Sequence, residues 1–261
     1  MFIDSHCHLN FDCFKQDLAT LLAELKSANI TQVIIPATDA ARWPEIITLC
    51  EKYAELYFAL GIHPHFLSTF KAEDLVTLES TLLNLHHQAE HHCIALGEIG
   101  LDKLIDTSME TQEAVFLAQL AIAQRLQLPV ILHVVKTQSR ILQLLKQTKF
   151  SYGGVYHAFS GSEEIANEFI KLGFKLGIGG VITHPTAKKT QKTLSKLPLS
   201  SLVLETDAPD MPVYQQSTEF NSPLNITVIF EALCALREEP RDVIAQRIYN
   251  NSKSIFPIIN D

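Results

Sequence analysis

The chain has 261 residues, of which 47% are hydrophobic and 19% are charged, and its formal net charge is −8. This length exceeds that of an ordinary single domain but suits one α/β barrel, and the composition supports a large core. The negative charge argues against a broad basic surface for nucleic acid. It leaves open local contacts with phosphate through metal ions.

The start of the chain lacks the basic and long apolar stretches of a secretory signal. No apolar run approaches the roughly 20 residues of a membrane helix. The cysteines are odd in number and form no CxxC pair, which favours reduced thiols, mostly in the core. They are Cys7, Cys13, Cys50, Cys93 and Cys234. We therefore expect a cytoplasmic protein without membrane contact or an obligate protein partner, and we expect a monomer.

Short apolar runs alternate with longer amphipathic segments along the chain. Most runs show little polar alternation, which is typical of strands covered on both faces. The predicted strands are 2–6, 32–36, 56–61, 93–98, 129–133, 154–157, 175–179 and 202–205. The predicted helices are 15–28, 41–53, 73–90, 110–127, 138–147, 162–172 and 186–196, followed by 223–237 and 240–252.

Eight strands that alternate with helices predict a parallel sheet, and the number eight points to a closed (β/α)8 TIM barrel. A doubly wound sheet is the alternative, but it would need a phosphate loop or a switch-point motif. The chain contains neither GxGxxG after a strand nor GxxxxGK[ST]. No linker or low-complexity tract divides it. We predict one α/β domain over residues 1–261.

His6 and His8 follow the first predicted strand. Residues two apart on an extended strand point the same way, so both imidazoles can meet at one point while Cys7 faces away. This arrangement can form half of a metal site. The alternative is two loop histidines with separate hydrogen-bond partners, and this tripeptide alone does not decide between them.

In a parallel barrel, functional residues lie at the carboxyl ends of the strands. Strands 1, 4, 5, 6 and 8 all end in ligand-type side chains, a recurrence that core packing does not explain. Six ligands exceed the needs of one tetrahedral zinc ion with an open position, but suit two metals that share a carboxylate. Zinc, manganese, magnesium or nickel would fit this chemistry. The candidate ligands are His6, His8, Glu98, His133, His157 and Asp207. A second group, His86, His87, His91 and His92, precedes strand 4 on the opposite face, where we expect solvated side chains.

Six stretches of the chain resemble the TatD-like metal-dependent deoxyribonucleases, which are amidohydrolase-type barrels, and the resemblance covers nearly the whole chain. The stretches are FIDSHCHL at 2–9, LGIHPH at 60–65, GEIGLD at 97–102, LPVILH at 128–133, HAFSG at 157–161 and LPLSSLVLETDAP at 197–209. Residues 179–185 and 210–212 look most similar to the YjjV-type branch. The resemblance implies a metal-dependent hydrolase with two divalent metal ions per chain. It implies that His6, His8 and Asp207 hold one metal with Glu98. It further implies that His133 and His157 hold the second metal, with Glu98 as the bridge.

Two departures from the family pattern concern the substrate. The family's His-x-Arg after strand 5 reads His133-Val-Val-Lys136 here, and the family's Arg-Asn-x-Pro reads Phe-Asn-Ser-Pro at 220–223. Lysine cannot reproduce the bidentate phosphate contact of a guanidinium group. These changes leave the predicted metal ligands intact and affect the expected substrate preference.

We predict catalytic roles for Asp207, as general base, and for Glu98, as the bridge. His63, His65 and Lys136 are the predicted substrate contacts. Lys103, Lys188 and Lys189 are weaker candidates, because surface lysines are usually only solvated. Asp102 is a candidate for orienting a ligand.

Three functions fit these residues. The first is hydrolysis of DNA phosphodiesters, at single-stranded ends, because an acidic surface does not wrap a duplex. The second is metal-dependent hydrolysis of a small ester, lactone or amide. The third is a metal-binding partner protein without catalysis, which the complete ligand set disfavours.

Overall fold

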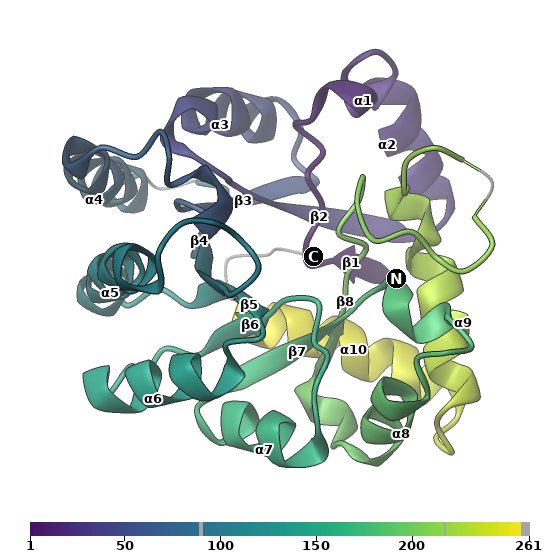
Figure 1. Cartoon of the computed structure of the whole chain (residues 1–261). Coiled ribbons are helices and arrows are strands. Elements are labelled where there is room, and N and C mark those ends of the chain that lie inside the picture. Colours follow the sequence, from purple (N-terminus) through teal and green to yellow (C-terminus); the bar gives the residue numbers. More distant parts are fainter. Residues whose placement is uncertain (89–90, 217, 257–261) are drawn as a thin grey trace.

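A computed structural model describes residues 1–88, 91–216 and 218–256. Eight parallel strands form a barrel, and each strand pairs with the next one along the chain. The strands are β1 (Phe2–Asp4), β2 (Ile30–Pro36), β3 (Leu56–Leu60), β4 (Cys93–Asp102), β5 (Val130–Val135), β6 (Gly154–Tyr156), β7 (Phe174–Ile178) and β8 (Leu202–Leu204). Helices surround them (Figure 1). The predicted TIM barrel is confirmed.

The barrel closes between β8 and β1 near the carboxyl ends of these strands. The backbone nitrogen of Ser5 donates to the Leu204 carbonyl at 3.0 Å, and that of Asp207 donates to the His6 carbonyl at 2.8 Å. A third bond runs from the His8 nitrogen to the Ala208 carbonyl at 2.8 Å. The barrel is therefore closed by the segments after β1 and β8, which carry the candidate ligands His6, His8 and Asp207.

The described helices comprise ten α-helices and five short 3-10 helices. The α-helices are α1 (Asp12–Lys15), α2 (Leu18–Ser27), α3 (Trp43–Lys52), α4 (Ala72–His86), α5 (Met109–Leu126), α6 (Gln138–Thr148), α7 (Glu163–Lys171), α8 (Lys188–Lys196), α9 (Ile226–Ala235) and α10 (Arg241–Ile255). The 3-10 helices are η1 (Ala40–Arg42), η2 (Pro64–Phe66), η3 (Gly180–Thr183), η4 (Leu199–Ser201) and η5 (Pro223–Asn225).

Most predicted elements are present, but several boundaries are wrong. The predicted helix 15–28 begins only at Leu18, because Asp17 has a non-helical backbone, and Lys15 belongs to the separate short helix α1. Strand β4 continues beyond Glu98 to Asp102, since Gly100 pairs with His133 and brings the two backbones too close for any Cβ at that position. Helix α4 ends at His86, and residues 89–90 of the predicted helix 73–90 lie outside the described residues.

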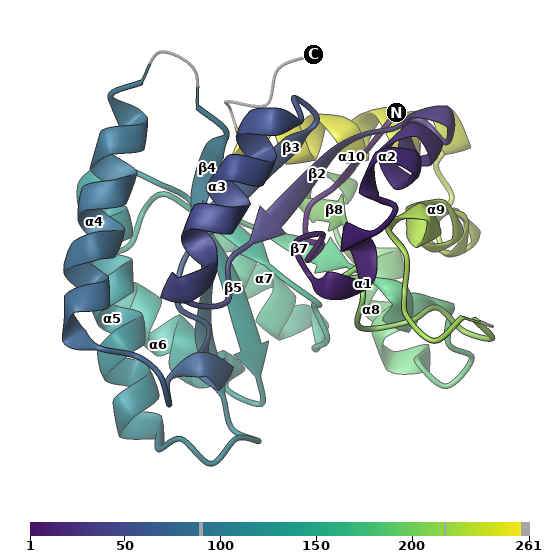
Figure 2. The ribbon, with the colours of Figure 1, turned by 90° about the horizontal axis from the view of Figure 1, so that it is seen from above.

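Two apolar layers stabilise the barrel. The inner layer fills its interior with branched side chains, including Ile3, Ile94 and Ile131, and α10 adds Tyr249 to it. The outer layer lies between the strands and the helices. Helix α10 crosses the N-terminal ends of the strands (Figure 2) and covers that end of the barrel.

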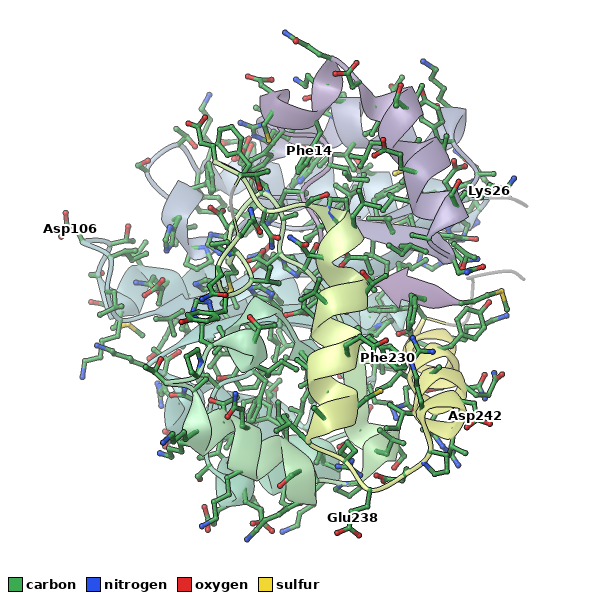
Figure 3. The ribbon with its side chains drawn as sticks, turned by 90° about the vertical axis from the view of Figure 1, so that its right-hand side faces the viewer. Phe14, Lys26, Asp106, Phe230, Glu238 and Asp242 are labelled. Atoms are coloured by element: carbon green, nitrogen blue, oxygen red, sulfur yellow. The ribbon has the colours of Figure 1, made fainter. Side chains whose placement is uncertain are left out.

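Helix α9 covers the outside of β1. Phe230 lies on the side of α9 that faces α10 and β1 (Figure 3), with its ring 4.8 Å from that of Phe2. In the same view, Asp106 projects from the carboxyl end of the barrel, whereas Lys26 lies at the opposite end. The barrel thus has one end covered by α10 and one end formed by the loops after the strands.

All five cysteines are free thiols, and the predicted core positions of Cys7, Cys50 and Cys93 are confirmed. Cys13 is exposed and Cys234 is partly buried, in agreement with the expectation that most of the cysteines, and not all, lie in the core. Among the described residues, no helix combines the length and the apolarity that crossing a membrane would require.

Candidate metal centre

The six candidate ligands meet at the carboxyl end of the barrel. His6 and His8 follow β1, Glu98 lies within β4, and His133 lies within β5. The other two, His157 and Asp207, follow β6 and β8. Side chains from five separate strands therefore converge in one place, and all of them are buried or nearly so.

One group of ligand atoms surrounds His6. Its Nε2 atom lies 3.4 Å from His8 Nε2, 3.2 Å from Glu98 Oε2 and 3.4 Å from Asp207 Oδ1. His8 Nε2 lies 3.6 Å from the same Asp207 oxygen and 4.0 Å from Glu98 Oε2. Four atoms around a zinc ion at 2.0–2.1 Å would be about 3.4 Å apart. The donor set and its spacing fit one divalent cation.

The other carboxylate oxygen of Glu98 faces a second group of histidines. Oε1 lies 3.0 Å from His133 Nδ1, 3.5 Å from His63 Nε2 and 3.7 Å from His157 Nε2. The His157 ring also stacks on His6 at 3.8 Å, so it lies between the two groups. Each oxygen of Glu98 thus has its own set of nitrogen atoms, as a bridging carboxylate requires.

Two further carboxylates orient the histidines of the second group. Glu205 Oε1 accepts a hydrogen bond from His157 Nδ1 at 3.2 Å, and Asp102 Oδ2 accepts one from His133 Nε2 at 3.1 Å. These bonds use one nitrogen of each ring and turn the other nitrogen toward Glu98. A carboxylate behind a histidine is the usual means of fixing the tautomer of a metal ligand.

Glu205 needs space that only a glycine provides. A Cβ atom on Gly177, in the neighbouring strand β7, would lie 2.1 Å from Glu205 Oε2. Two residues beside the site also adopt left-handed backbone conformations that non-glycine residues seldom use, Ala158 with φ 48° and Asp207 with φ 57°. Glu205 and Asp207, two residues apart, both lie beside His157 in this site.

Asp4 is a buried carboxylate that the sequence analysis missed. It accepts hydrogen bonds from the backbone nitrogens of His6 and Thr206, at 3.2 and 3.0 Å, and from the Thr206 hydroxyl at 2.6 Å. It therefore joins the segment after β1 to the segment after β8. The sequence contains a signal for it, because residues 4, 6 and 8 share one face of an extended strand.

The loop after β8 is held by Asn221, which belongs to the altered Arg-Asn-x-Pro segment. Its side-chain nitrogen donates to the carbonyls of Thr206 at 2.9 Å, Asp210 at 2.8 Å and Met211 at 3.1 Å. The loss of the family arginine at 220 thus leaves the anchoring asparagine in place. Phe220 at that position is exposed.

Burial and mutual charge shift the proton affinities of the cluster. Burial raises the pKa of Asp207 to about 7 and lowers that of His8 to about 4. Burial also opposes protonation of His157, but Asp207, Glu205 and Glu98 outweigh it and raise the His157 pKa to about 10. Without a metal, this site therefore holds protons at neutral pH.

The predicted substrate contacts have different surroundings. His63 lies beside Glu98, as described, and is buried. The side chain of His65 is 47% exposed, and its Nε2 lies 2.8 Å from Asp102 Oδ2. Lys136 is exposed and has a left-handed backbone, with φ 55°. Their roles toward a substrate stay predictions.

The lysines proposed as weaker phosphate contacts, Lys103, Lys188 and Lys189, are exposed. At the other end of the barrel, His86 and His87 are solvated as expected. His92 is only partly exposed, which corrects the expectation for it, because it stacks on Tyr57 at 5.2 Å and its Nδ1 bonds to the Leu56 carbonyl at 2.6 Å.

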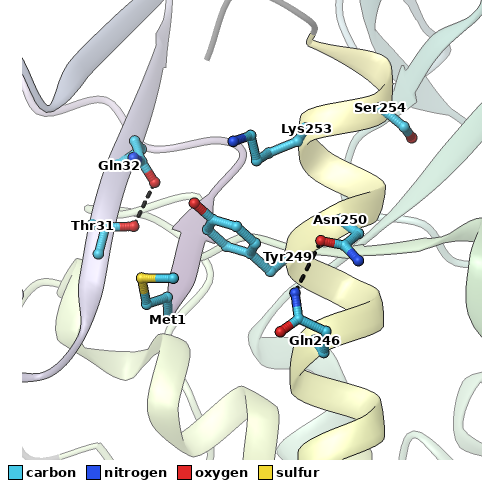
Figure 4. Close-up of a pocket in the computed structure, with 8 residues that line it drawn as sticks. All are labelled: Met1, Thr31, Gln32, Gln246, Tyr249, Asn250, Lys253 and Ser254. Carbon is cyan, nitrogen blue, oxygen red and sulfur yellow. Dashed lines mark hydrogen bonds between the residues drawn. The ribbon is translucent and has the colours of Figure 1, made fainter. Parts of the chain in front are cut away.

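A pocket of about 680 Å³ opens at the N-terminal end, between β2 and α10 (Figure 4). Its lining consists of Met1, Thr31, Gln32, Gln246, Tyr249, Asn250, Lys253 and Ser254. None of these is a histidine or a carboxylate, so this pocket offers no ligand set comparable to the one at the carboxyl end.

An eight-stranded parallel barrel with histidines and carboxylates at the carboxyl ends of its strands defines a TIM barrel of the metal-dependent hydrolase type. A family model described as "TatD related DNase" matches residues 3–257. The chain belongs to this TatD-related family.

Individual relatives agree with this assignment. The "Uncharacterized metal-dependent hydrolase YjjV" of Escherichia coli (strain K12) is 41% identical over 258 residues, which cover 98% of each chain. An "Uncharacterized metal-dependent hydrolase" of Haemophilus influenzae is 37% identical and covers 98% of this chain and 99% of its own.

Solved structures show the same barrel. The crystal structure of YjjV from E. coli matches with a TM-score of 0.94 over 98% of both chains. A TatD family hydrolase from Entamoeba histolytica, 21% identical, matches with a TM-score of 0.84 over 99% of this chain and 98% of the other. The expected similarity to YjjV is confirmed.

Proposed function

We propose that the protein is a hydrolase that uses two divalent metal ions to cleave phosphodiester bonds of DNA. One metal would be held by His6, His8 and Asp207 with Glu98, and the other by His133 and His157 with Glu98. The observation that carries the proposal is the position of Glu98, whose two oxygens face separate sets of histidine nitrogens at 3.0–4.0 Å.

Two metals at these positions would polarise a phosphoryl oxygen and lower the pKa of water. Asp207 would accept the proton of the attacking water. Its Oδ1 lies 3.4 Å from His6 Nε2 and 3.6 Å from His8 Nε2, among the side chains that would hold the metal and its water. His157 Nε2 lies 3.9 Å from Asp207 Oδ2, so the two side chains are close neighbours in the site.

A DNA substrate is supported by the family description, and metal-dependent hydrolysis is supported by the names of the relatives. The net charge of −8 favours a strand end that enters the site over a duplex that lies along the surface. His63 and His65 lie beside Glu98 and Asp102, and these two histidines and Lys136 are the proposed substrate contacts.

The test is incubation of the metal-loaded protein with a labelled single-stranded oligonucleotide and, separately, with a panel of p-nitrophenyl esters. Manganese, magnesium, zinc and nickel are each supplied. We expect oligonucleotide cleavage that Asp207→Asn reduces by about 10²-fold or more, because a general base contributes that much. Ester turnover without nuclease turnover under all four metals would replace this function with small-ester hydrolysis. No turnover of either kind would point to a binding protein.

A further inference from the structure

A substrate strand brings more than one phosphate to the site, and only the scissile phosphate meets the metals. A second phosphate needs a cation on the protein. Val135 occupies the position of the family arginine, and the following Lys136 offers no guanidinium group. A guanidinium group that binds this second phosphate must therefore come from an arginine elsewhere in the chain.

Most of the six arginines are committed to carboxylates or lie far from the site. Four bond directly to glutamates, in the pairs Arg125–Glu79, Arg140–Glu113, Arg237–Glu239 and Arg241–Glu231. Arg247 is on α10, which covers the N-terminal end of the barrel. The sixth is Arg42.

Arg42 stands at the carboxyl end of the barrel, in a stack that leads to the metal centre. Its guanidinium carbon lies 5.0 Å from the centre of the Phe11 ring. The Phe11 ring is stacked on His8, with 5.0 Å between ring centres and 24° between planes. Together, the two distances place the guanidinium group within about 10 Å of the His8 ring.

Asp39 fixes the guanidinium group by one edge. Its Oδ2 lies 3.4 Å from Arg42 Nε, and its Oδ1 accepts a hydrogen bond from the backbone nitrogen of Ala41 at 3.0 Å. Among the described residues, the two Nη atoms of Arg42 have no hydrogen-bond partner, and the side chain is 35% exposed. The edge that recognises phosphate in a bidentate manner therefore has no protein partner among these residues.

The nearby acidic side chains do not occupy that edge. Asp12 is bonded to Lys15 at 2.8 Å. Asp39 Oδ2, the oxygen beside Arg42 Nε, also accepts a hydrogen bond from the Thr38 hydroxyl at 3.0 Å. The cation–π contact with Phe11 and the ion pair with Asp39 hold Arg42 in one orientation, so little side-chain entropy is lost when an anion binds.

We propose that Arg42 binds a phosphate of the substrate strand adjacent to the scissile one, as a substrate-positioning residue. This inference rests on the proposed phosphodiesterase function. The guanidinium group lies within about 10 Å of the His8 ring, close enough for a neighbouring phosphate of a strand held at the metal centre to reach it. Arg42 therefore favours oligonucleotides over small phosphodiesters that carry a single phosphate.

The test compares Arg42→Ala with the wild type on two substrates, a single-stranded oligonucleotide and bis(p-nitrophenyl) phosphate. We expect KM for the oligonucleotide to rise about tenfold, as for loss of a charge-assisted hydrogen bond, with kcat little changed. The salt dependence of log KM should weaken by about 0.7, the slope for one phosphate contact on a single strand. The kinetics with bis(p-nitrophenyl) phosphate and the metal content should stay as in the wild type.

Arg241→Ala is the matched control. Arg241 also lies over a phenylalanine ring, Phe230 at 4.9 Å, and also bonds to a carboxylate, Glu231, but α10 places it away from the metal centre. It should leave both substrates unaffected. Arg42→Lys, which keeps the charge but not the fork, should recover part of the loss and most of the salt slope.

Equal losses on both substrates, or loss of metal in Arg42→Ala, would show that Arg42 only supports His8 and would overturn the inference. An unchanged oligonucleotide KM would overturn it as well while leaving the proposed function intact. Failure of the wild-type protein to cleave the oligonucleotide with any metal would remove the proposed function and this inference together.

Discussion

Replacing Glu205 with glutamine tests how the histidine after β6 is held. Glu205 is fully buried, and its Oε1 accepts hydrogen bonds from His157 Nδ1 at 3.2 Å and from the backbone nitrogen of Ala158. Its Oε2 has no hydrogen-bond partner among the described residues. Glutamine keeps the shape, but its amide nitrogen can only donate. If the amide oxygen faces His157, the amide nitrogen has no acceptor at the former Oε2 position. If the amide nitrogen faces His157, the backbone N–H of Ala158 loses its acceptor.

A buried donor without an acceptor costs about 1–3 kcal/mol, so the free energy of unfolding of the metal-free protein should fall by about that amount. Loss of the carboxylate behind a metal-binding histidine costs about 10–100-fold in metal affinity. Only the metal position formed by His133 and His157 should weaken. Of the six candidate ligands, all of which the structure describes, Glu205 is hydrogen-bonded to His157 alone.

The assay is calorimetric titration of the metal-free protein with zinc, beside urea denaturation. The wild type should bind two ions, and Glu205→Gln should weaken one of them. Glu163→Gln is the control, because Glu163 is an exposed glutamate at the start of α7 that lies 3.4 Å from Lys196. Unchanged affinity and stability in Glu205→Gln, or equal weakening of both ions, would refute the assigned role of Glu205.

Three further predictions follow from the same contacts. Asp102→Asn should weaken the second metal position by about tenfold or more, because Asp102 bonds to His133. His65→Ala, which removes a half-exposed ring beside Asp102, should change metal affinity little. Equal effects of the two variants in calorimetry would contradict this prediction. Gly177→Ala should lower the free energy of unfolding by about 1–3 kcal/mol and displace a metal, and denaturation beside metal analysis checks this. Metal affinity should rise from pH 6 to 8. The pKa values of Asp207 and His157 are raised to about 7 and about 10, so the metal-free folded protein retains a proton on each group until the pH exceeds its pKa. Metal must displace these protons, and fewer of them remain at higher pH. Titration in buffers of different ionisation enthalpy measures the protons released, and a pH-independent affinity would contradict the prediction.

The barrel and the six candidate ligands could be predicted because both depend on regular patterns. Short apolar runs separated by helices define parallel strands, and the ends of parallel strands share one face of the barrel. His6 and His8 also obey the period of two of an extended chain, which brings their Nε2 atoms to 3.4 Å. The resemblance to the TatD family added the expected grouping of the ligands, which the site geometry alone does not test.

Two features that the sequence does not reveal are the support of His157 by Glu205 and the backbone turn at Asp207. Glu205 reaches His157 because Gly177 leaves space on the neighbouring strand, and Asp207 turns into the site through a left-handed conformation. Neither feature follows from hydrophobic periodicity. The extension of β4 to Asp102 was missed because its glycines resemble a strand end, whereas Gly100 permits a close approach to β5.

His63 was predicted to contact the substrate, and its position beside Glu98 Oε1 at 3.5 Å could not be foreseen. The rigid turn of η2 aims the side chain inward, since His63 Nδ1 accepts a hydrogen bond from the backbone nitrogen of His65 at 3.1 Å. Turn geometry of this kind leaves only a weak trace in the sequence.

The central claim is that Glu98 joins two metal positions, and metal analysis of purified protein tests it most directly. Elemental analysis of the wild type, saturated with zinc and freed of excess metal, should give two ions per chain. Glu98→Ala should lose most of both, because each oxygen of this carboxylate faces a different group of histidines. Two ions per chain retained in Glu98→Ala would contradict the account.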